Sequence, residues 1–261
     1  MPDVPHIDTT IPHSARVTNY WLGGKDYYPV DREMGDQVLD AFPELAACAR
    51  AGRQLLIRAV THMAAKEGIR QFLDVGTGLP TQNNVHEVAQ GVAPDARVVY
   101  VDNDPLVLAH ARALLTSSPE GETHYVDADL SDVSAVLERT RAHLDLSRPV
   151  GLTMMGTLGH FDGAEARRIV RGYVDALPSG SLLALGDNTD TSETVVEAAR
   201  RWNATANVPY HLRSPQEIED LFEGTELLEP GVVSFPLWRP EDSEVGAPTE
   251  IDAYCGVARK P

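Results

Sequence analysis

A glycine-rich turn, Gly76-Thr77-Gly78, follows the apolar run Phe72–Val75 and precedes the helical segment VHEVAQGV. In a parallel α/β sheet, a turn at this place faces the carboxyl ends of the strands, where ligands bind. Glycine permits backbone conformations and a close ligand approach that a Cβ atom obstructs. A lone G-x-G is weak evidence, because any tight strand-to-helix turn can require glycine. The residues that follow the next strands add weight to it.

Two carboxylates come at the ends of the following strand-like runs. Asp102 ends RVVYVD, where an acid can accept hydrogen bonds from both hydroxyls of a ribose. The alternative for Asp102 is a helix N-cap ahead of Pro105, a role that Asp104 can fill instead. Asp129 follows the third run, where a carboxylate can accept a hydrogen bond from the exocyclic amine of adenine. Asp127 competes for that role, and helix capping is the alternative for both.

The loop departs from two common phosphate-binding patterns. Thr81 occupies the position of the last glycine in G-x-G-x-x-G, and no Gly-Lys-Ser/Thr sequence follows the loop. The pattern therefore lacks a pyrophosphate cradle. It favours a nucleoside ligand without phosphates.

The elements that must position these residues alternate between strand and helix. From Ile69 onward, helical segments follow each of five β-rich runs: RQFLDV, RVVYVD, THYVDA, PVGLTMM and SLLALG. This alternation is typical of a parallel sheet covered on both faces. ELLEPGVVSF and IDAYCGVARK follow with no helix between them, which predicts an antiparallel pair at one edge. We expect a seven-stranded α/β domain over residues 68–261, preceded by a helical extension over residues 1–67.

Composition and charge argue against several function classes. The chain has 261 residues, of which 39 are acidic and 22 basic, for a net charge of −17. Such an excess disfavours binding to a nucleic-acid backbone or to an anionic membrane. No apolar run reaches the ~20 residues of a spanning helix. The start, MPDVPHIDTTIPHS, lacks the basic leader and apolar core of a signal peptide. We expect a cytoplasmic protein with no nucleic-acid or membrane partner.

Metal binding is not expected. The two cysteines are too few for a cysteine-based zinc site or a disulfide framework. The nine histidines are scattered, and none forms an HxH or HExxH pair.

These features resemble the class I S-adenosylmethionine-dependent methyltransferases, and more closely an actinobacterial family of methyltransferases first catalogued as a domain of unknown function. The resemblance extends over nearly the whole chain. It is carried by the segments Ala15–Asp26, Gln71–Glu87, Ala93–Leu115, Asp127–Asp132, Leu237–Pro240 and Gly256–Pro261. The resemblance implies S-adenosylmethionine as the cofactor and a Rossmann-like sheet with the strand order 3-2-1-4-5-7-6. Strand 7 would be antiparallel, helices would cover both faces, and the N-terminal extension would form a lid.

The resemblance also assigns seven residues to the cofactor. Those around its methionine end would be Asp74, Gly76 and Gly78, and those around its nucleoside would be Asp102, Asn103, Asp129 and Leu130. One departure is visible at Pro80, where the class often has a third glycine. Because proline cannot donate a backbone hydrogen bond, the amino-acid end of the cofactor is expected to be held differently.

Candidate catalytic chemistry centres on the segment after the fourth strand, MGTLGHF. Methyl transfer from a sulfonium is an in-line displacement, and a general base is needed only when the acceptor must lose a proton. His160 is the candidate base; the alternative is a histidine that packs over the cofactor or caps the next helix. Asn188, after the fifth strand, is expected to face the site. The segment lacks the Asn/Asp-Pro-Pro-Tyr motif, which disfavours nucleobase methylation.

The turn between the first two expected helices, GGKDYY, is a candidate lid. In this interpretation Lys25 meets a carboxylate, Tyr20 and Tyr27 stack on a substrate, and Asp26 lies beside them. The alternative is an exposed turn whose tyrosines attach the N-terminal helices to the domain. Together these features predict a methyltransferase that acts on a small-molecule acceptor. The competing prediction is a non-catalytic regulatory module that binds S-adenosylmethionine or S-adenosylhomocysteine.

Overall fold

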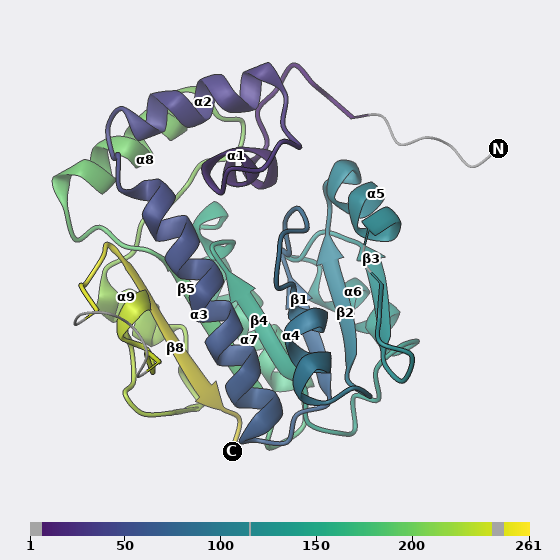
Figure 1. Cartoon of the computed structure of the whole chain (residues 1–261). Helices are drawn as coiled ribbons and strands as arrows, with labels where there is room; N and C mark the ends of the chain where they lie inside the picture. The colour runs from purple at the N-terminus through teal and green to yellow at the C-terminus, as the bar shows by residue number, and fades with distance from the viewer. Residues whose placement is uncertain (1–6, 115, 242–247) are drawn as a thin grey trace.

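A mostly parallel sheet forms the centre of the computed structural model, which describes residues 7–114, 116–241 and 248–261. Its strand order is β3-β2-β1-β4-β5-β8-β6, and β7 also pairs with β8 (Figure 1). The parallel strands are β1 (Gln71–Val75), β2 (Arg97–Asp102), β3 (Glu122–Asp127), β4 (Gly151–Met155) and β5 (Leu182–Asn188). β8 (Ala253–Arg259) runs antiparallel to β5. The five predicted parallel strands and their order are thus confirmed.

The predicted sixth strand is divided into two short pieces. β6 (Glu226–Leu227) and β7 (Val233–Ser234) both pair antiparallel with β8. Pro230 and Gly231 lie between them, and the N–H of Gly231 donates to the carbonyl of Leu228 at 2.8 Å. Because proline has no N–H for a sheet ladder and Gly231 has a φ of +86°, the chain turns there instead of continuing as one strand. Taken as one strand, the two pieces complete the predicted order with its antiparallel last strand.

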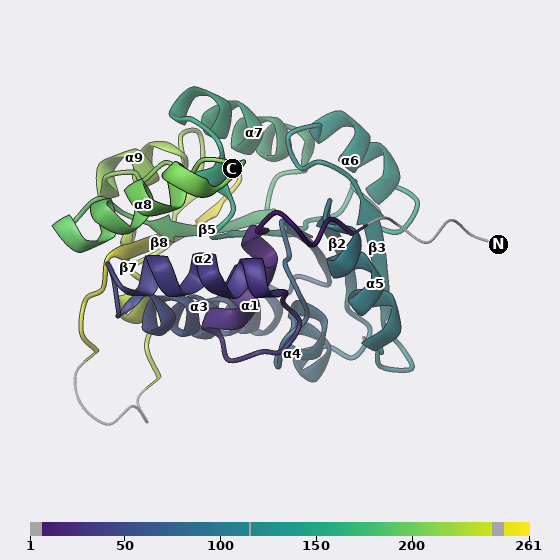
Figure 2. The same cartoon turned by 90° about the horizontal axis from the view of Figure 1, so that it is seen from above.

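Helices cover both faces of the sheet. On one face lie α6 (Val133–Thr140), α7 (Gly163–Ala176) and α9 (Pro215–Asp220), and on the other lie α3 (Leu45–Ala65) and α4 (Val85–Val92) (Figure 2). The β1 segment QFLDV is buried at every position, as a central strand in such a sandwich must be. Its consecutive residues Phe72 and Leu73 point to opposite faces of the sheet, into two separate hydrophobic clusters. α5 (Pro105–Leu114) packs beside β3.

The N-terminal helices are placed differently from one another. α1 (Ser14–Trp21) and α2 (Pro29–Leu39) lie across the carboxyl ends of the strands, whereas α3 lies along a face of the sheet (Figure 1). α8 (Glu193–Thr205) packs beside α2, and the two share a hydrophobic cluster that includes Val38, Phe42, Val195 and Trp202. Within the predicted extension 1–67, α1 and α2 are therefore the part that covers the strand ends. Residues 1–6 of that extension lie outside the described residues.

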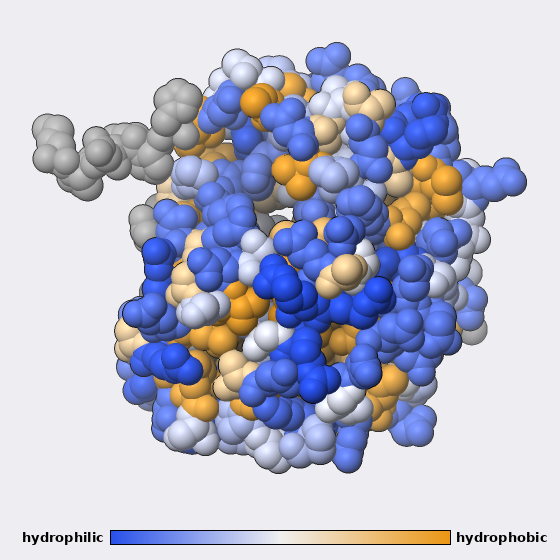
Figure 3. Space-filling view, turned by 180° about the vertical axis from the view of Figure 1, so that it is seen from behind, coloured by the Kyte–Doolittle hydropathy of each residue, from blue (hydrophilic) through white to orange (hydrophobic). Residues whose placement is uncertain are grey.

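The rear face of the molecule is mainly hydrophilic (Figure 3). On the rear face, hydrophobic residues form separate patches divided by hydrophilic side chains (Figure 3). None of the helices described is long and apolar enough to cross a membrane.

Candidate active site

A cavity of about 580 Å³ lies above the carboxyl ends of the parallel strands, beneath α1 and α2. Its volume falls within the ~300–1,000 Å³ that is typical of small-molecule sites. The loops after the strands form a polar half. Apolar side chains of α2, α3, α8 and the segment between α2 and α3 form the other half, among them Val38, Phe42, Leu45, Val195 and Trp202. The two halves can therefore receive ligands of different polarity.

The two glycines of the β1 loop have left-handed backbones, with φ of +70° at Gly76 and +67° at Gly78. A Cβ atom on Gly76 would lie 2.3 Å from Oγ1 of Thr157, so this position packs directly against the loop after β4. A Cβ atom on Gly78 would meet nothing within 4 Å. Gly76 is therefore required by the protein's own packing, whereas Gly78 leaves open space next to the cavity.

Asp74 lies buried beneath this loop. Its carboxylate accepts hydrogen bonds from Oγ1 of Thr77, at 2.7 Å, and from Oγ1 of Thr153. Burial raises the pKa of Asp74, and these hydroxyls together with the charge of Arg53 oppose that shift. The side chain still lines the cavity, so it can present a carboxylate to a ligand.

Asp102 joins the β1 loop to the end of β2. Its Oδ2 accepts from the N–H of Gly78 at 2.9 Å and its Oδ1 from the N–H of Asp104 at 2.9 Å. Burial raises the pKa of Asp102. Asp104 instead accepts from the N–H of Leu106, at 2.8 Å, in the first turn of α5. The capping role thus belongs to Asp104, while Asp102 and the exposed Asn103 line the cavity.

Of the two competing acids, Asp127 ends β3 and Asp129 follows it, and Asp129 alone belongs to the described cavity lining. Asp129 and Leu130 both line the cavity, and the carboxylate of Asp129 accepts from the N–H and the hydroxyl of Ser131, at 2.8 and 2.7 Å. Asp127 is exposed and lies outside the described cavity lining. The structure therefore separates two carboxylates that the sequence leaves equivalent.

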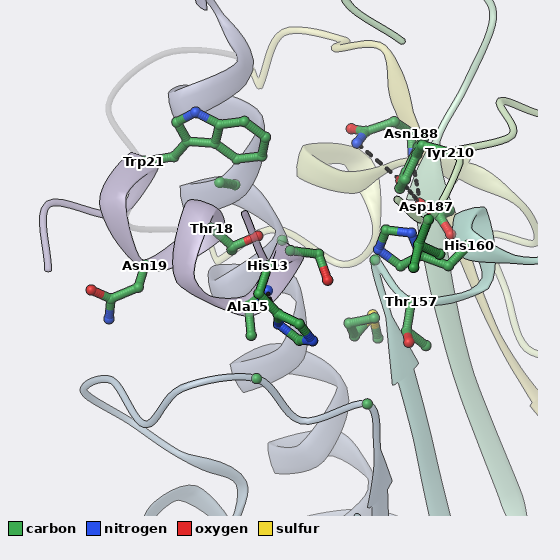
Figure 4. A pocket seen from close by; sticks show the side chains of 18 of the residues that line it. His13, Ala15, Thr18, Asn19, Trp21, Thr157, His160, Asp187, Asn188 and Tyr210 are labelled. Carbon is green, nitrogen blue, oxygen red and sulfur yellow. Dashed lines mark hydrogen bonds between the residues drawn. The ribbon is translucent and has the colours of Figure 1, made fainter. Parts of the chain in front are cut away.

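His160 ends a short 3₁₀-helix, η1 (Leu158–His160), and lines the cavity (Figure 4). Its Nδ1 lies 3.3 Å from the carbonyl oxygen of Pro209, and its ring packs against Tyr210 with centroids 5.3 Å apart. Burial lowers the pKa of His160. The N-cap of the next helix, α7, is Asp162, so capping by His160 is excluded.

A buried carboxylate that the sequence analysis did not identify lies beside His160. Asp187 accepts hydrogen bonds from the hydroxyl of Tyr210 and from the N–H of Gly159, the latter at 2.7 Å. Asn188 lines the cavity as expected, and its Nδ2 donates to the Tyr210 hydroxyl at 3.2 Å (Figure 4). Burial raises the pKa of both Asp187 and Tyr210. These groups form one hydrogen-bonded wall of the cavity.

This site, above the carboxyl ends of a parallel sheet, agrees with the family to which the sequence matches. The profile of a family described as S-adenosyl methyltransferase matches residues 2–261. The chain belongs to this family. It is an S-adenosylmethionine-dependent methyltransferase, and the competing prediction of a non-catalytic binding module is not favoured. No curated protein matches the chain.

Solved structures agree with this assignment. A DUF574 family protein from Streptomyces avermitilis is 46% identical, with a TM-score of 0.93 over 98% of this chain and 100% of that chain. A protein of Thermobifida fusca classed as a methyltransferase is 39% identical, with a TM-score of 0.90 over 100% of this chain and 99% of that chain. Magnesium protoporphyrin IX methyltransferase from Synechocystis, with bound S-adenosylhomocysteine, shares the fold at 11% identity, with a TM-score of 0.54 over 94% of this chain and 93% of that chain.

The methyltransferase has a cationic side chain in its cavity that the sequence analysis also missed. Arg53 projects from α3, and its Nη2 donates to the carbonyls of Gln82 and Asn83, at 3.4 and 3.1 Å. Its Nε is buried and has no hydrogen-bond partner among the residues that the structure describes. Burial lowers the pKa of Arg53, and the charge of Asp74 opposes that shift. Arg53 therefore offers an unused donor to a ligand.

The four residues predicted to contact a substrate from the lid lie outside the described cavity lining: Tyr20, Lys25, Asp26 and Tyr27. The Tyr20 hydroxyl donates to Asp36 on α2, and the rings of Tyr20 and Tyr27 pack edge to face with centroids 5.1 Å apart. Lys25 is exposed. On α1, Thr18 and Trp21 line the cavity and Tyr20 does not, while the other three residues lie in the turn after this helix.

The GGKDYY turn instead attaches the covering helices to the rest of the methyltransferase, which is the alternative that the sequence left open. The carboxylate of Asp26 lies 3.2 Å from Nε2 of His110 on α5. The N–H of Asp26 donates to Oδ1 of the buried Asn19, at 3.0 Å. α1 and α2 thus cover the cavity, but this turn does not line it.

A buried ionic cluster also connects the covering helices to the nucleoside end of the cavity. The guanidinium of Arg16, on α1, lies 3.7 Å from Asp31 on α2 and 3.5 Å from Asp104 after β2. Nδ1 of His13 lies 3.0 Å from the same Asp104 carboxylate. Because Asp104 also donates its N–H to Asp102, the cluster is one hydrogen bond away from the cavity. In the part of the chain that the structure describes, no group of histidine, cysteine or acidic residues could hold a metal ion.

Proposed function

We propose that this methyltransferase transfers the methyl group of S-adenosylmethionine to a small-molecule acceptor inside the covered cavity. The observation that carries the proposal is the division of one cavity of about 580 Å³ into a polar half and an apolar half beneath α1 and α2. The polar half suits a nucleoside with a charged amino-acid end. The apolar half is left for the acceptor.

The nucleoside end of the cofactor would lie on the loops after β2 and β3. Asp102 would accept hydrogen bonds from the ribose hydroxyls, because a carboxylate that already accepts one N–H on each oxygen keeps further lone pairs. Asn103 would lie beside the adenine ring, and Asp129 and Leu130 near its edge. All of these residues line the cavity at the ends of the paired strands β2 and β3, which supports the assignment.

The methionine end would lie between the β1 loop and α3. Asp74 would face the ammonium group, and the open space at Gly78 would admit the chain of the ligand. Arg53 would bind the carboxylate through its buried, unpartnered Nε. A guanidinium from α3 would thus replace the backbone donor that Pro80 cannot supply.

When bound, S-adenosylmethionine supplies a methyl group on a sulfonium that is open to in-line attack. The chain's own contribution is to orient donor and acceptor and to exclude water, which α1 and α2 do by covering the strand ends. Enclosure beneath two helices favours a free small molecule over a residue within a polymer. The net charge of −17 further disfavours a nucleic-acid acceptor.

Transfer of a labelled methyl group tests this proposal. The methyltransferase is incubated with S-adenosylmethionine carrying a labelled methyl group and with an actinobacterial extract divided into a small-molecule fraction and a macromolecular fraction. We expect label in the small-molecule fraction, identified by mass, and its loss in Asp102→Asn. Label confined to proteins or nucleic acids would overturn the small-molecule proposal.

A further inference from the structure

We infer that the acceptor is an uncharged, mainly apolar compound with a hydroxyl group, which is bound and deprotonated by Nε2 of His160. Asp187 and Tyr210 act as positioning residues for this histidine. The inference rests on the proposed function and adds to it the class of acceptor and the residues that select it. It is carried by the contacts on the wall of the cavity formed by η1, the end of β5 and the segment before Arg213.

The hydrogen bond of His160 defines which nitrogen is free. Its Nδ1 lies 3.3 Å from the carbonyl oxygen of Pro209, and a carbonyl oxygen only accepts hydrogen bonds. Nδ1 must therefore carry the proton, which leaves Nε2 of the neutral ring with a lone pair. No contact described in the structure engages Nε2. Because burial lowers the pKa of His160, the ring is neutral near pH 7 and can accept a proton.

Asp187 and Tyr210 hold the histidine in place from two directions. The carboxylate of Asp187 accepts from the N–H of Gly159, the residue before His160, at 2.7 Å, and from the hydroxyl of Tyr210. The ring of Tyr210 contacts the imidazole edge to face, and a Cβ atom on Gly159 would lie 2.4 Å from that ring. The loop at Gly159 and the ring of Tyr210 are therefore both held by hydrogen bonds to Asp187, and neither can shift without breaking one of them.

The charges that face His160 disfavour an anionic acceptor. The charge of Asp187, on β5, favours the protonated form of His160. His211, on the segment after α8, and His13, before α1, disfavour that form. On this wall the guanidinium of Arg213 is buried, donates to the carbonyls of η1 and its flanking residues, and acts on the charge of Asp187. Its Nε has no hydrogen-bond partner among the described residues, but Arg213 does not belong to the described cavity lining. An acidic group on the acceptor would therefore meet the carboxylate of Asp187, and the one guanidinium among the described cavity-lining residues, that of Arg53, is assigned to the carboxylate of the cofactor.

Apolar side chains make up much of the remaining lining, together with the polar Thr18, Asn19 and Asn207. The ring of Trp202 lies 6.3 Å from that of His160, and its Nε1 already donates to the carbonyl of Val208, at 2.9 Å. Phe42, Leu45 and Val195 line the same half of the cavity. A flat hydrocarbon or aromatic body fits these walls, because such a ligand has no polar group that would be buried against them without a hydrogen-bond partner.

The resulting step is balanced in atoms and charge. The acceptor hydroxyl gives its proton to Nε2 of His160, and its oxygen forms a bond to the methyl carbon. The carbon–sulfur bond breaks, and its electron pair stays on sulfur as a neutral thioether. The imidazolium that forms lies near the carboxylate of Asp187, whose charge favours the protonated ring.

The state of His160 can be measured by nitrogen NMR on the labelled protein saturated with S-adenosylhomocysteine. His160→Gln assigns the signals, and His143→Gln, outside the described cavity lining, serves as the matched control. We expect a neutral ring with the proton on Nδ1 at about pH 7. In Tyr210→Phe, which loses the hydroxyl bond to Asp187, we expect a shifted His160 titration, whereas Tyr254→Phe should leave it unchanged. An imidazolium, or a proton on Nε2, would overturn the inference.

The acceptor class is tested with 2-naphthol, naphthalene and 2-naphthoate as probes on the complex with S-adenosylhomocysteine. We expect 2-naphthol to bind at least about 10-fold more tightly than either of the others, and His160→Gln to remove that preference. Equal or tighter binding of 2-naphthoate, or failure of 2-naphthol to bind, would overturn the inference. Failure of the wild type to bind S-adenosylhomocysteine would instead count against the proposed function, so the two failures are distinguishable.

Discussion

The backbone N–H of Gly78 donates to the carboxylate of Asp102 at 2.9 Å. This bond joins the glycine-rich loop after β1 to the acid at the end of β2, two features that are separate in the sequence. It fixes Oδ2 of Asp102 toward the loop, while Oδ1 accepts from the N–H of Asp104. The carboxylate therefore has a defined orientation before any ligand binds, which reduces the ordering that binding requires.

Asp102→Asn should weaken S-adenosylhomocysteine binding by about 10- to 100-fold. Both carboxylate oxygens of Asp102 accept a backbone N–H, so the NH₂ group of asparagine would face one of these N–H groups and could not accept a hydrogen bond from it. Isothermal calorimetry measures the change in Kd. Asp127→Asn is the matched control, since Asp127, like Asp102, is the last residue of its strand but is exposed and outside the described cavity lining. Equal weakening in both variants would contradict the role assigned to Asp102.

Arg53→Gln should weaken binding of S-adenosylhomocysteine by about 10- to 100-fold, since a charge-assisted hydrogen bond to its carboxylate is lost. Methylthioadenosine lacks the amino acid, so its Kd should not change in the same variant. Arg50→Gln, exposed on the same helix, is the control. A similar loss of affinity for both ligands would show that Arg53 acts on the shape of the cavity instead of on the carboxylate.

The parts of the site that the sequence predicts are those that follow strands. β1 and β2 are recognisable because burial on both faces demands apolar runs, and so the residues after them can be placed at one edge of the sheet. Asp187 could have been found in the same way, because it is the second-to-last residue of β5, next to Asn188. Arg53 could not, since nothing in its own helix shows which face meets the cavity.

The packing of Tyr20 against α2 shows why the sequence does not reveal which residues of α1 line the cavity. A Cβ atom on Gly35 of α2 would lie 2.6 Å from the Tyr20 ring, so this tyrosine fills a space that only glycine leaves on the neighbouring helix. That fit turns Thr18 and Trp21 of α1 toward the cavity. The orientation depends on a pairing between two helices, which the pattern of α1 alone does not contain. Tyr210 lies in an irregular segment, where the sequence has no period to follow.

Gly76→Ala and Gly78→Ala should separate folding from binding. The first places a Cβ atom 2.3 Å from Thr157 in a left-handed backbone, so we expect a loss of about 2–4 kcal/mol in the free energy of unfolding. The second meets no protein atom and should cost only about 1–2 kcal/mol for its backbone, yet weaken cofactor binding. Urea unfolding and calorimetry measure the two effects. Unchanged affinity in folded Gly78→Ala would place the cofactor away from this loop.

Arg16→Met should loosen the covering helices while the sheet stays intact. The variant leaves Asp31 and Asp104 buried without their shared cation, and breaking a buried pair costs about 3–5 kcal/mol. We expect faster amide hydrogen exchange in α1 and α2 and faster dissociation of S-adenosylhomocysteine. Arg32→Met, which removes an exposed pair with Asp36, is the control. Faster exchange in β1 and β4 as well would indicate global destabilisation and contradict a local role.

Asp187→Asn should change how stability depends on pH. Burial raises the pKa of Asp187 in the folded protein above its ordinary value of ~3.9, so the folded state holds this proton more tightly than the unfolded chain does. The free energy of unfolding of the wild type should therefore fall, relative to Asp187→Asn, as the pH rises from ~3.9 through the raised pKa. Asp74 and Asp102, whose pKa values burial also raises, are present in both proteins and cancel in the difference. Urea unfolding of both proteins between about pH 4 and pH 8 measures this difference. A wild type that gains stability over Asp187→Asn as the pH rises would show that the hydrogen bonds from Tyr210 and Gly159 outweigh burial at this carboxylate.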